Sequence, residues 1–110
     1  MATGEYIEPG PTREEIDATR GNFVLEFGEN WCGYCQGARP HIEAALAERP
    51  DVRHIKALDG RGKPLGRSFR VKLWPTLIVL KDGAEVARVV RPTGTEDVRV
   101  ALARLDGTGE

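Results

Sequence analysis

The sequence has little of what usually cross-links or anchors a small protein. Only two of its 110 residues are cysteines, Cys32 and Cys35, and they stand close together in the chain. A disulfide across so short a loop constrains little of the unfolded chain, so this pair cannot hold a fold together. The sequence also contains no run of 18 apolar residues, which excludes a membrane-spanning helix, and we expect no contact with a membrane.

The sequence also lacks an excess of charge of one sign, because acidic and basic side chains nearly balance and leave a formal net charge of −1. No overall electrostatic field therefore attracts nucleic acid or an anionic membrane. The distribution is uneven, because residues 1–30 carry seven acidic and two basic side chains whereas residues 49–72 carry eight basic and two acidic ones. We interpret the basic segment as a solvated surface and expect no nucleic-acid partner.

The first ten residues are polar and lack the apolar core of a secretory signal peptide. We therefore expect a cytoplasmic protein, or a periplasmic one if the natural chain carries a leader ahead of this sequence. In a reducing compartment, two cysteines at this spacing are catalytic or metal-binding more often than structural.

Hydrophobic periodicity and turn signals predict one α/β domain over residues 1–110. A long helical segment between two buried strands predicts a right-handed crossover with parallel strands. Asp82-Gly83 is the strongest hairpin signal, and Thr12 and Thr95 are the expected helix caps. The expected strands are residues 5–8, 22–27, 51–58, 76–81 and 85–90, and the expected helices begin at residue 12 and cover 32–49, 65–69 and 96–105.

The most informative stretch is residues 31–35, Trp-Cys-Gly-Tyr-Cys, at the predicted start of the long helix. The nucleophile in disulfide exchange is a thiolate, and the unpaired N–H groups at a helix N-terminus stabilise negative charge. This position therefore suits Cys32 to act as a nucleophile. Cys35 lies one turn further along on the same face, where it can reach the Cys32 sulfur.

Zinc is the main alternative role for this pair, since two cysteines and two histidines would complete a tetrahedral shell. The only histidines are His41 and His54, which are separated by twelve residues where zinc fingers use three to five. We therefore favour redox chemistry and expect neither a metal nor another cofactor.

Further motifs accompany the cysteines: Pro40 within the predicted helix, Trp74-Pro75-Thr76 ahead of another strand, and Gly107 at the end of the last helix. Together with residues 31–35 they resemble the thioredoxin family over nearly the whole chain. The resemblance implies a thioredoxin fold, in which helices flank a central mixed sheet of four to five strands. It also implies thiol–disulfide exchange on protein substrates.

The resemblance implies that Cys32 attacks a substrate disulfide and that Cys35 then resolves the mixed disulfide. Gly33 permits a tight turn and leaves the sulfurs approachable, and Pro40 is expected to kink the helix. Pro75 matches the cis-proline of the family, with a trans proline at a strand start as the alternative. The residues expected to contact substrate are Trp31, Gly33, Tyr34, Trp74, Pro75 and Thr93. Trp74 either narrows the groove beside the sulfurs or packs inward.

Glu26 interrupts a strand that is expected to be buried on both faces, where an unpaired charge is costly. The family carries an aspartate at the matching position that helps to deprotonate the resolving cysteine. By resemblance, Glu26 would do the same for Cys35, and Lys56 would be the family's partner lysine. The alternatives are that Glu26 points outward or merely pairs with Lys56.

Tyr34 stands where thioredoxin itself has proline, and Gly33-Tyr34 is similar to the pair in periplasmic disulfide isomerases. We expect a monomeric reductase of protein disulfides, recycled by a thioredoxin reductase or a small thiol. A second hypothesis uses the same pair as a thiol oxidant or disulfide isomerase. A third is a non-catalytic binding module on the thioredoxin scaffold.

Overall fold

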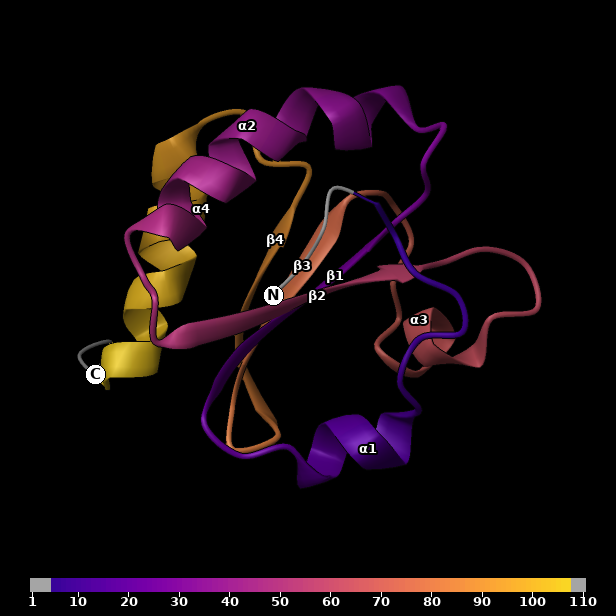
Figure 1. Ribbon diagram of the computed structural model, residues 1–110, viewed down its shortest axis with the longest axis horizontal. Helices are drawn as coiled ribbons and strands as arrows, with labels where there is room; N and C mark the ends of the chain where they lie inside the picture. The colour runs from indigo at the N-terminus through magenta and orange to yellow at the C-terminus, as the bar shows by residue number, and fades with distance from the viewer. Residues whose placement is uncertain (1–4, 108–110) are drawn as a thin grey trace.

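The computed structural model describes residues 5–107 and is built on a four-stranded sheet of order β2-β1-β3-β4 (Figure 1). The strands are β1 (Asn22–Gly28), β2 (Val52–Leu58), β3 (Thr76–Lys81) and β4 (Ala84–Val90). The helices are α1 (Arg13–Ala18), α2 (Gly33–Ala47), α3 (Pro64–Ser68), α4 (Thr95–Ala103) and the 3-10 turn η1 (Arg104–Asp106). Since β1 runs parallel to β2 and antiparallel to β3, the predicted mixed sheet is confirmed.

The hairpin between β3 and β4 follows the predicted turn. Asp82 and Gly83 both have positive φ angles, 51° and 85°, as a tight hairpin turn of this sequence type requires. The Asp82 carboxylate also accepts a hydrogen bond from the Gly21 N–H at 2.8 Å. The turn is therefore anchored to the residue that precedes β1.

The predicted first strand, residues 5–8, is reduced to a single parallel bridge between Ile7 and Ala57. The Ile7 N–H donates to the Lys56 carbonyl at 2.8 Å, and the Leu58 N–H donates to the Ile7 carbonyl at 2.9 Å. The N-terminal segment thus lies along the free edge of β2. This placement brings the neighbouring Tyr6 onto the face of the sheet beneath α2.

One predicted helix cap is confirmed and the other is wrong. Thr12 caps α1 in a reciprocal arrangement with Glu15. At α4 the N-cap is Gly94 and not Thr95, which is the first helical residue. There Asp97 reaches back to accept the Thr93 N–H at 3.0 Å and stabilises the loop ahead of the helix.

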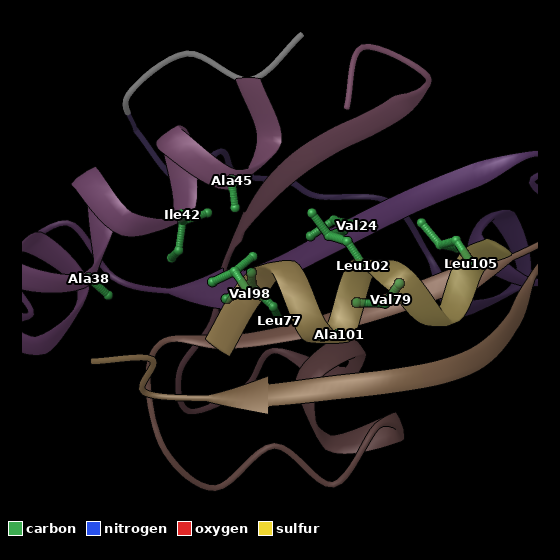
Figure 2. Packing of buried hydrophobic residues seen from close by; sticks show 10 residues of the cluster. All are labelled: Val24, Ala38, Ile42, Ala45, Leu77, Val79, Val98, Ala101, Leu102 and Leu105. Carbon is green, nitrogen blue, oxygen red and sulfur yellow. The ribbon is translucent and has the colours of Figure 1, made fainter. Parts of the chain in front are cut away.

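Apolar side chains fill both sides of the sheet, as expected for a central strand buried on both faces. One cluster joins the sheet to α2, α4 and η1 (Figure 2): Val24, Ala38, Ile42, Ala45, Leu77, Val79, Val98, Ala101, Leu102 and Leu105. The opposite cluster joins the sheet to α1 and the segment after α3: Ile16, Phe23, Leu25, Phe27, Ala57, Phe69, Ile78 and Leu80. Successive β1 residues alternate between the clusters, so β1 supports both layers.

Helix α2 runs without a break through Pro40, and its ribbon changes direction part-way along (Figure 1). The Pro40 side chain is exposed, so its ring disturbs no packing. Across residues 5–107, no helix combines the length and the apolar composition that crossing a membrane requires.

Candidate active site

Cys32 is the N-cap residue of α2, with an extended backbone at φ −76° and ψ 119°. Its sulfur accepts a hydrogen bond from the Cys35 N–H at 3.2 Å and thereby takes the place of the usual capping oxygen. The residue is partly exposed. A substrate can therefore reach a sulfur whose anionic form is stabilised by the start of the helix.

Cys35 lies one turn into α2 and is only 4% exposed. Burial, followed by a hydrogen bond with Cys32, raises the pKa of the Cys35 thiol to about 11. The Glu29 backbone and the neighbouring Tyr6 hydroxyl act in the opposite direction and lower that pKa. The two thiols therefore differ in access to solvent, which suits the partly exposed Cys32 to attack a substrate and the buried Cys35 to react second.

Glu26 is buried on the α2 side of β1, with 1% of its surface exposed, so the alternative that it points outward is wrong. One carboxylate oxygen accepts a short hydrogen bond from the Tyr6 hydroxyl, and the other lies 2.8 Å from His54 Nε2. Lys56 lies beside Glu26 in the β1–β2 register and holds its ammonium group 4.5 Å from the Tyr6 ring centroid. Glu26 thus belongs to a buried polar cluster.

Gly28, the last residue of β1, lies against both Tyr6 of this polar cluster and Cys35. A Cβ added at Gly28 would lie 2.5 Å from the Tyr6 hydroxyl oxygen and 2.8 Å from the Cys35 sulfur, both too close for any real side chain. Only glycine therefore fits at the end of β1 against both the hydroxyl and the sulfur.

The Trp74-Pro75 peptide bond is cis, so the alternative of a trans proline is wrong. Trp74 is half-buried against the α1-side cluster, and its ring N–H donates to Asp59 at 2.9 Å. Its carbonyl accepts a hydrogen bond from Arg91 Nε at 2.8 Å. The indole is therefore tied down, which agrees with the inward-packing alternative, and Arg91 covers the carbonyl beside Pro75.

The exposed side of the cysteine pair carries aromatic side chains and one cation. Trp31 and Tyr34 are 86% and 63% exposed, and the Arg91 guanidinium lies 3.8 Å above the Tyr34 ring centroid. Next to them is an open cavity of about 850 Å³. It is lined by Gly33, Tyr34, Gly37, Ala38, His41, Arg91, Pro92 and Thr93.

The expected role of Gly33 in a tight turn is wrong, because Gly33 has no positive φ and sits in the first turn of α2. A Cβ at this position would meet no atom within 4 Å. What Gly33 does provide is open space beside Cys32.

Comparison with known proteins agrees with this geometry. The family model for thioredoxin matches residues 9–104. This chain belongs to the thioredoxin family. It is similar to the structure of reduced thioredoxin 2 from Pseudomonas aeruginosa, with 47% identity, a TM-score of 0.85 and coverage of 96% of this chain and 97% of that one.

Two other thioredoxins extend the comparison. The thioredoxin of Chlamydia pneumoniae is 42% identical over 71 residues, which cover 64% of this chain and 69% of that protein. The structure of Fasciola hepatica thioredoxin is 28% identical, with a TM-score of 0.66 and coverage of 83% of this chain and 85% of that one. The thioredoxin fold and the cysteine pair identify this chain as a thiol–disulfide oxidoreductase of that family.

The sequence alone did not single out Tyr6, Gly28, His54 or Arg91 as parts of the active site. Two of them leave a signal in the sequence. His54 stands two residues before Lys56, so strand alternation puts both on one face of β2, and Gly28 directly ends a buried strand. Tyr6 and Arg91 leave none, because their partners lie far away in the chain.

The alternative zinc site of this thioredoxin-family chain is not assembled. Within residues 5–107, no group of three or more His, Cys, Asp or Glu side chains is placed to hold a metal ion. His54 instead lies against Glu26, and His41 Nδ1 lies 3.4 Å from the Thr95 hydroxyl.

Proposed function

We propose that this protein reduces the disulfides of other proteins, with Cys32 as the nucleophile and Cys35 as the resolving cysteine. The observation that carries the proposal is the asymmetry of the pair. Cys32 is partly exposed and caps α2, whereas Cys35 is buried with a raised pKa. A dithiol of this kind gives up two electrons in two ordered substitutions.

In the first substitution, the Cys32 thiolate attacks one sulfur of the substrate disulfide. A bond forms between the Cys32 sulfur and that atom, and the other substrate sulfur leaves as a thiolate with the electron pair. The N–H of Cys35 and the start of α2 stabilise the attacking thiolate. The product is a mixed disulfide between Cys32 and the substrate.

In the second substitution, Cys35 loses its proton and attacks the Cys32 sulfur. The new bond joins Cys32 to Cys35, the bond from Cys32 to the substrate breaks, and the second substrate sulfur leaves as a thiolate. We propose that Glu26 accepts the Cys35 proton. Its burial and its hydrogen bond with Tyr6 in the buried polar cluster support this role. Lys56 on β2 is a further member of that cluster.

We propose that substrates bind along the open cavity between Tyr34 and Thr93 and across the edge formed by Trp31, Trp74 and Pro75. The exposure of Trp31 and Tyr34 next to Cys32 supports this surface, since exposed aromatic side chains are common at binding sites. Arg91 links its two sides through Tyr34 and the Trp74 carbonyl.

The decisive experiment is reduction of insulin disulfides by the reduced protein. We expect Cys32→Ser to abolish the reaction because no accessible nucleophile remains, and Cys35→Ser to accumulate a mixed disulfide visible by mass spectrometry. Activity that survives in Cys32→Ser, or a Cys35→Ser variant that captures no substrate, would contradict the proposal.

The direction of exchange is tested by the redox equilibrium with glutathione. A reduction potential near about −270 mV supports the reductase, whereas one near about −180 mV or above supports an oxidant or isomerase. Binding of a partner that persists after both cysteines are replaced by serine would support the binding-module hypothesis instead.

We propose a cytoplasmic monomer that is recycled by a thioredoxin reductase or a small thiol. The use of both cysteines for the redox pair, with none left for a structural disulfide, supports a reducing compartment. Helices on both faces of the sheet support the monomer. Sedimentation analysis tests the oligomeric state, and turnover with NADPH and a reductase, compared with glutathione alone, tests the recycling route.

A further inference from the structure

A tyrosine hydroxyl stands between the buried carboxylate and the buried sulfur. The Tyr6 side chain is 7% exposed and donates a short hydrogen bond to Glu26 Oε2. Its hydroxyl and the Cys35 sulfur lie against the same residue, Gly28, and the hydroxyl influences the pKa of Cys35. A side chain at Gly28 would occupy the space beside both groups, so the glycine leaves that space open. Glu26 and Cys35 are thus connected through a protein side chain.

We propose that Tyr6 is a further catalytic residue, whose hydroxyl passes the proton of the Cys35 thiol to Glu26 during the second substitution. The proposal rests on the proposed function, because it concerns how the resolving cysteine becomes a nucleophile. It adds a residue from the N-terminal segment, which the bridge between Ile7 and Ala57 fixes to the edge of β2.

The relay conserves protons and electrons. The Cys35 S–H bond breaks and its proton goes to the Tyr6 oxygen, while the Tyr6 O–H proton goes to Glu26 Oε2. Tyr6 ends as a neutral hydroxyl, Glu26 as a carboxylic acid, and Cys35 as the thiolate that attacks Cys32. The substrate disulfide is the oxidant, and no other co-reactant is needed.

The surroundings of Tyr6 keep it in the form that a relay needs. Burial, with Glu26 and Cys35 nearby, raises the pKa of the Tyr6 hydroxyl well above its ordinary value, so it keeps a proton to donate. The ammonium group of Lys56 lies over the ring, and His54 holds the other oxygen of Glu26. His54 is therefore a positioning residue for the carboxylate.

Glu26 can return its proton to solvent on the far side of the cluster. A cavity of about 530 Å³ lies between α2 and the outer edge of β2, and Glu26, Arg39, His54 and Lys56 are among its lining residues. The proton thus leaves Cys35 on the active-site side and is released beside β2.

The test separates the two substitutions in single-turnover stopped flow with an aryl disulfide whose thiolates are coloured. The first release of colour reports attack by Cys32, and the second reports resolution by Cys35. Tyr6→Phe should leave the rate of the first thiolate release within twofold of wild type. It should slow the rate of the second by about tenfold, which is less than the usual rate contribution of acid–base catalysis. The double variant Tyr6→Phe/Glu26→Gln should resolve no more slowly than the slower single variant, because both interrupt one path.

Ile7→Ala is the matched control, since it trims an exposed neighbour on the same segment and leaves the backbone bridge in place. Replacing Tyr34 by Phe leaves Tyr6 as the only tyrosine, so a fluorinated tyrosine can then be incorporated at position 6 alone. The fluorinated protein is compared with unfluorinated Tyr34→Phe. The fluorinated protein keeps the Tyr6 ring and its packing while changing the acidity of its hydroxyl. Its second release should change with that acidity and its first should not.

Three outcomes overturn the relay: a second release unaffected by Tyr6→Phe, an equal slowing of both releases, or independent effects that multiply in the double variant. An unchanged second release in the fluorinated protein does the same. If the wild-type protein shows a first release and no second, the proposed function itself fails, which is a different result.

Discussion

The two cysteines lie one helical turn apart and have opposite surroundings. Cys32 is partly exposed to solvent, and its sulfur accepts a hydrogen bond from the backbone N–H of Cys35. The exposed rings of Trp31 and Tyr34 flank it. Cys35 faces the sheet, where a carboxylate and a phenol, Glu26 and Tyr6, are buried beneath it. We propose that the exposed side of the pair recognises substrate and that the buried side moves a proton.

A Cys-x-x-Cys motif alone therefore does not show which cysteine attacks the substrate and which resolves the mixed disulfide. The exposed side is shaped by loops, among them the one that starts with Arg91, while the buried side is shaped by β1, β2 and the N-terminal segment. Changes on the buried side should therefore affect the second substitution, and changes on the exposed side should affect substrate binding.

The largest effect is expected from Glu26→Gln, which removes the proposed proton acceptor from the buried side. We expect the second substitution to slow by about 100-fold, within the usual range for loss of a general base, while the first is unchanged. Stopped-flow measurement of the two thiolate releases checks this. Glu96→Gln on the exposed first turn of α4 is the control, and a Glu26→Gln variant with normal resolution would show that the two sides do not divide the chemistry.

Gly28→Ala should disturb the buried side by packing alone. Its methyl group would lie within 3 Å of the Tyr6 hydroxyl and the Cys35 sulfur, neither of which can easily move. We expect the free energy of unfolding to fall by about 1–3 kcal/mol, the usual cost of overpacking. Urea denaturation measures it, and Gly33→Ala on the open side should change stability by less than about 0.5 kcal/mol. Equal losses of unfolding free energy in Gly28→Ala and Gly33→Ala would contradict the expected difference between the buried and the exposed side.

Local patterns predicted most of the fold, and on the exposed side of the site they singled out Trp31 and Tyr34 but not Arg91. Periodicity located β1, α2, β2 and β3, and Asp82-Gly83 located the hairpin, because these signals act within a few residues. The cap of α4 was wrong because Gly94 has the extended backbone of an N-cap and Asp97, which no cap rule singled out, reaches back to Thr93.

The buried side could be predicted only in part. Glu26 stood out because a carboxylate in a buried strand is costly. Tyr6 could not be found, since its contact with Glu26 depends on where the N-terminal segment docks along β2. Arg91 could not be found either, because its partners Tyr34 and Trp74 lie far away in the chain. Its positive φ of 51° is unusual for a residue that is not glycine.

The raised pKa of Cys35 predicts a pH-dependent contribution to the stability of the folded protein. With a pKa of about 11 in the folded protein and 9.0 as the ordinary value, the folded state retains a proton that the unfolded state has already lost. The stabilising contribution is therefore complete below pH 9 and is lost as the pH rises from 9 to about 11. Urea denaturation of the reduced protein across this range should show a fall that is absent in Cys35→Ala. A fall of equal size in both proteins would assign it to other groups.

The smallest effect is expected on the exposed side, from Arg91→Ala. Arg91 joins the Tyr34 ring to the Trp74 carbonyl, and an exposed cation–π contact contributes about 0.5–1 kcal/mol. Without it the groove loses a fixed wall, so the KM for insulin should rise about threefold, the affinity equivalent of that energy. The first release from a small aryl disulfide should stay unchanged, because that substrate needs no groove. Arg88→Ala, whose side chain pairs with Glu85 on the same strand, is the control. A change in the second substitution instead of in KM would mean that the exposed side also controls the buried one.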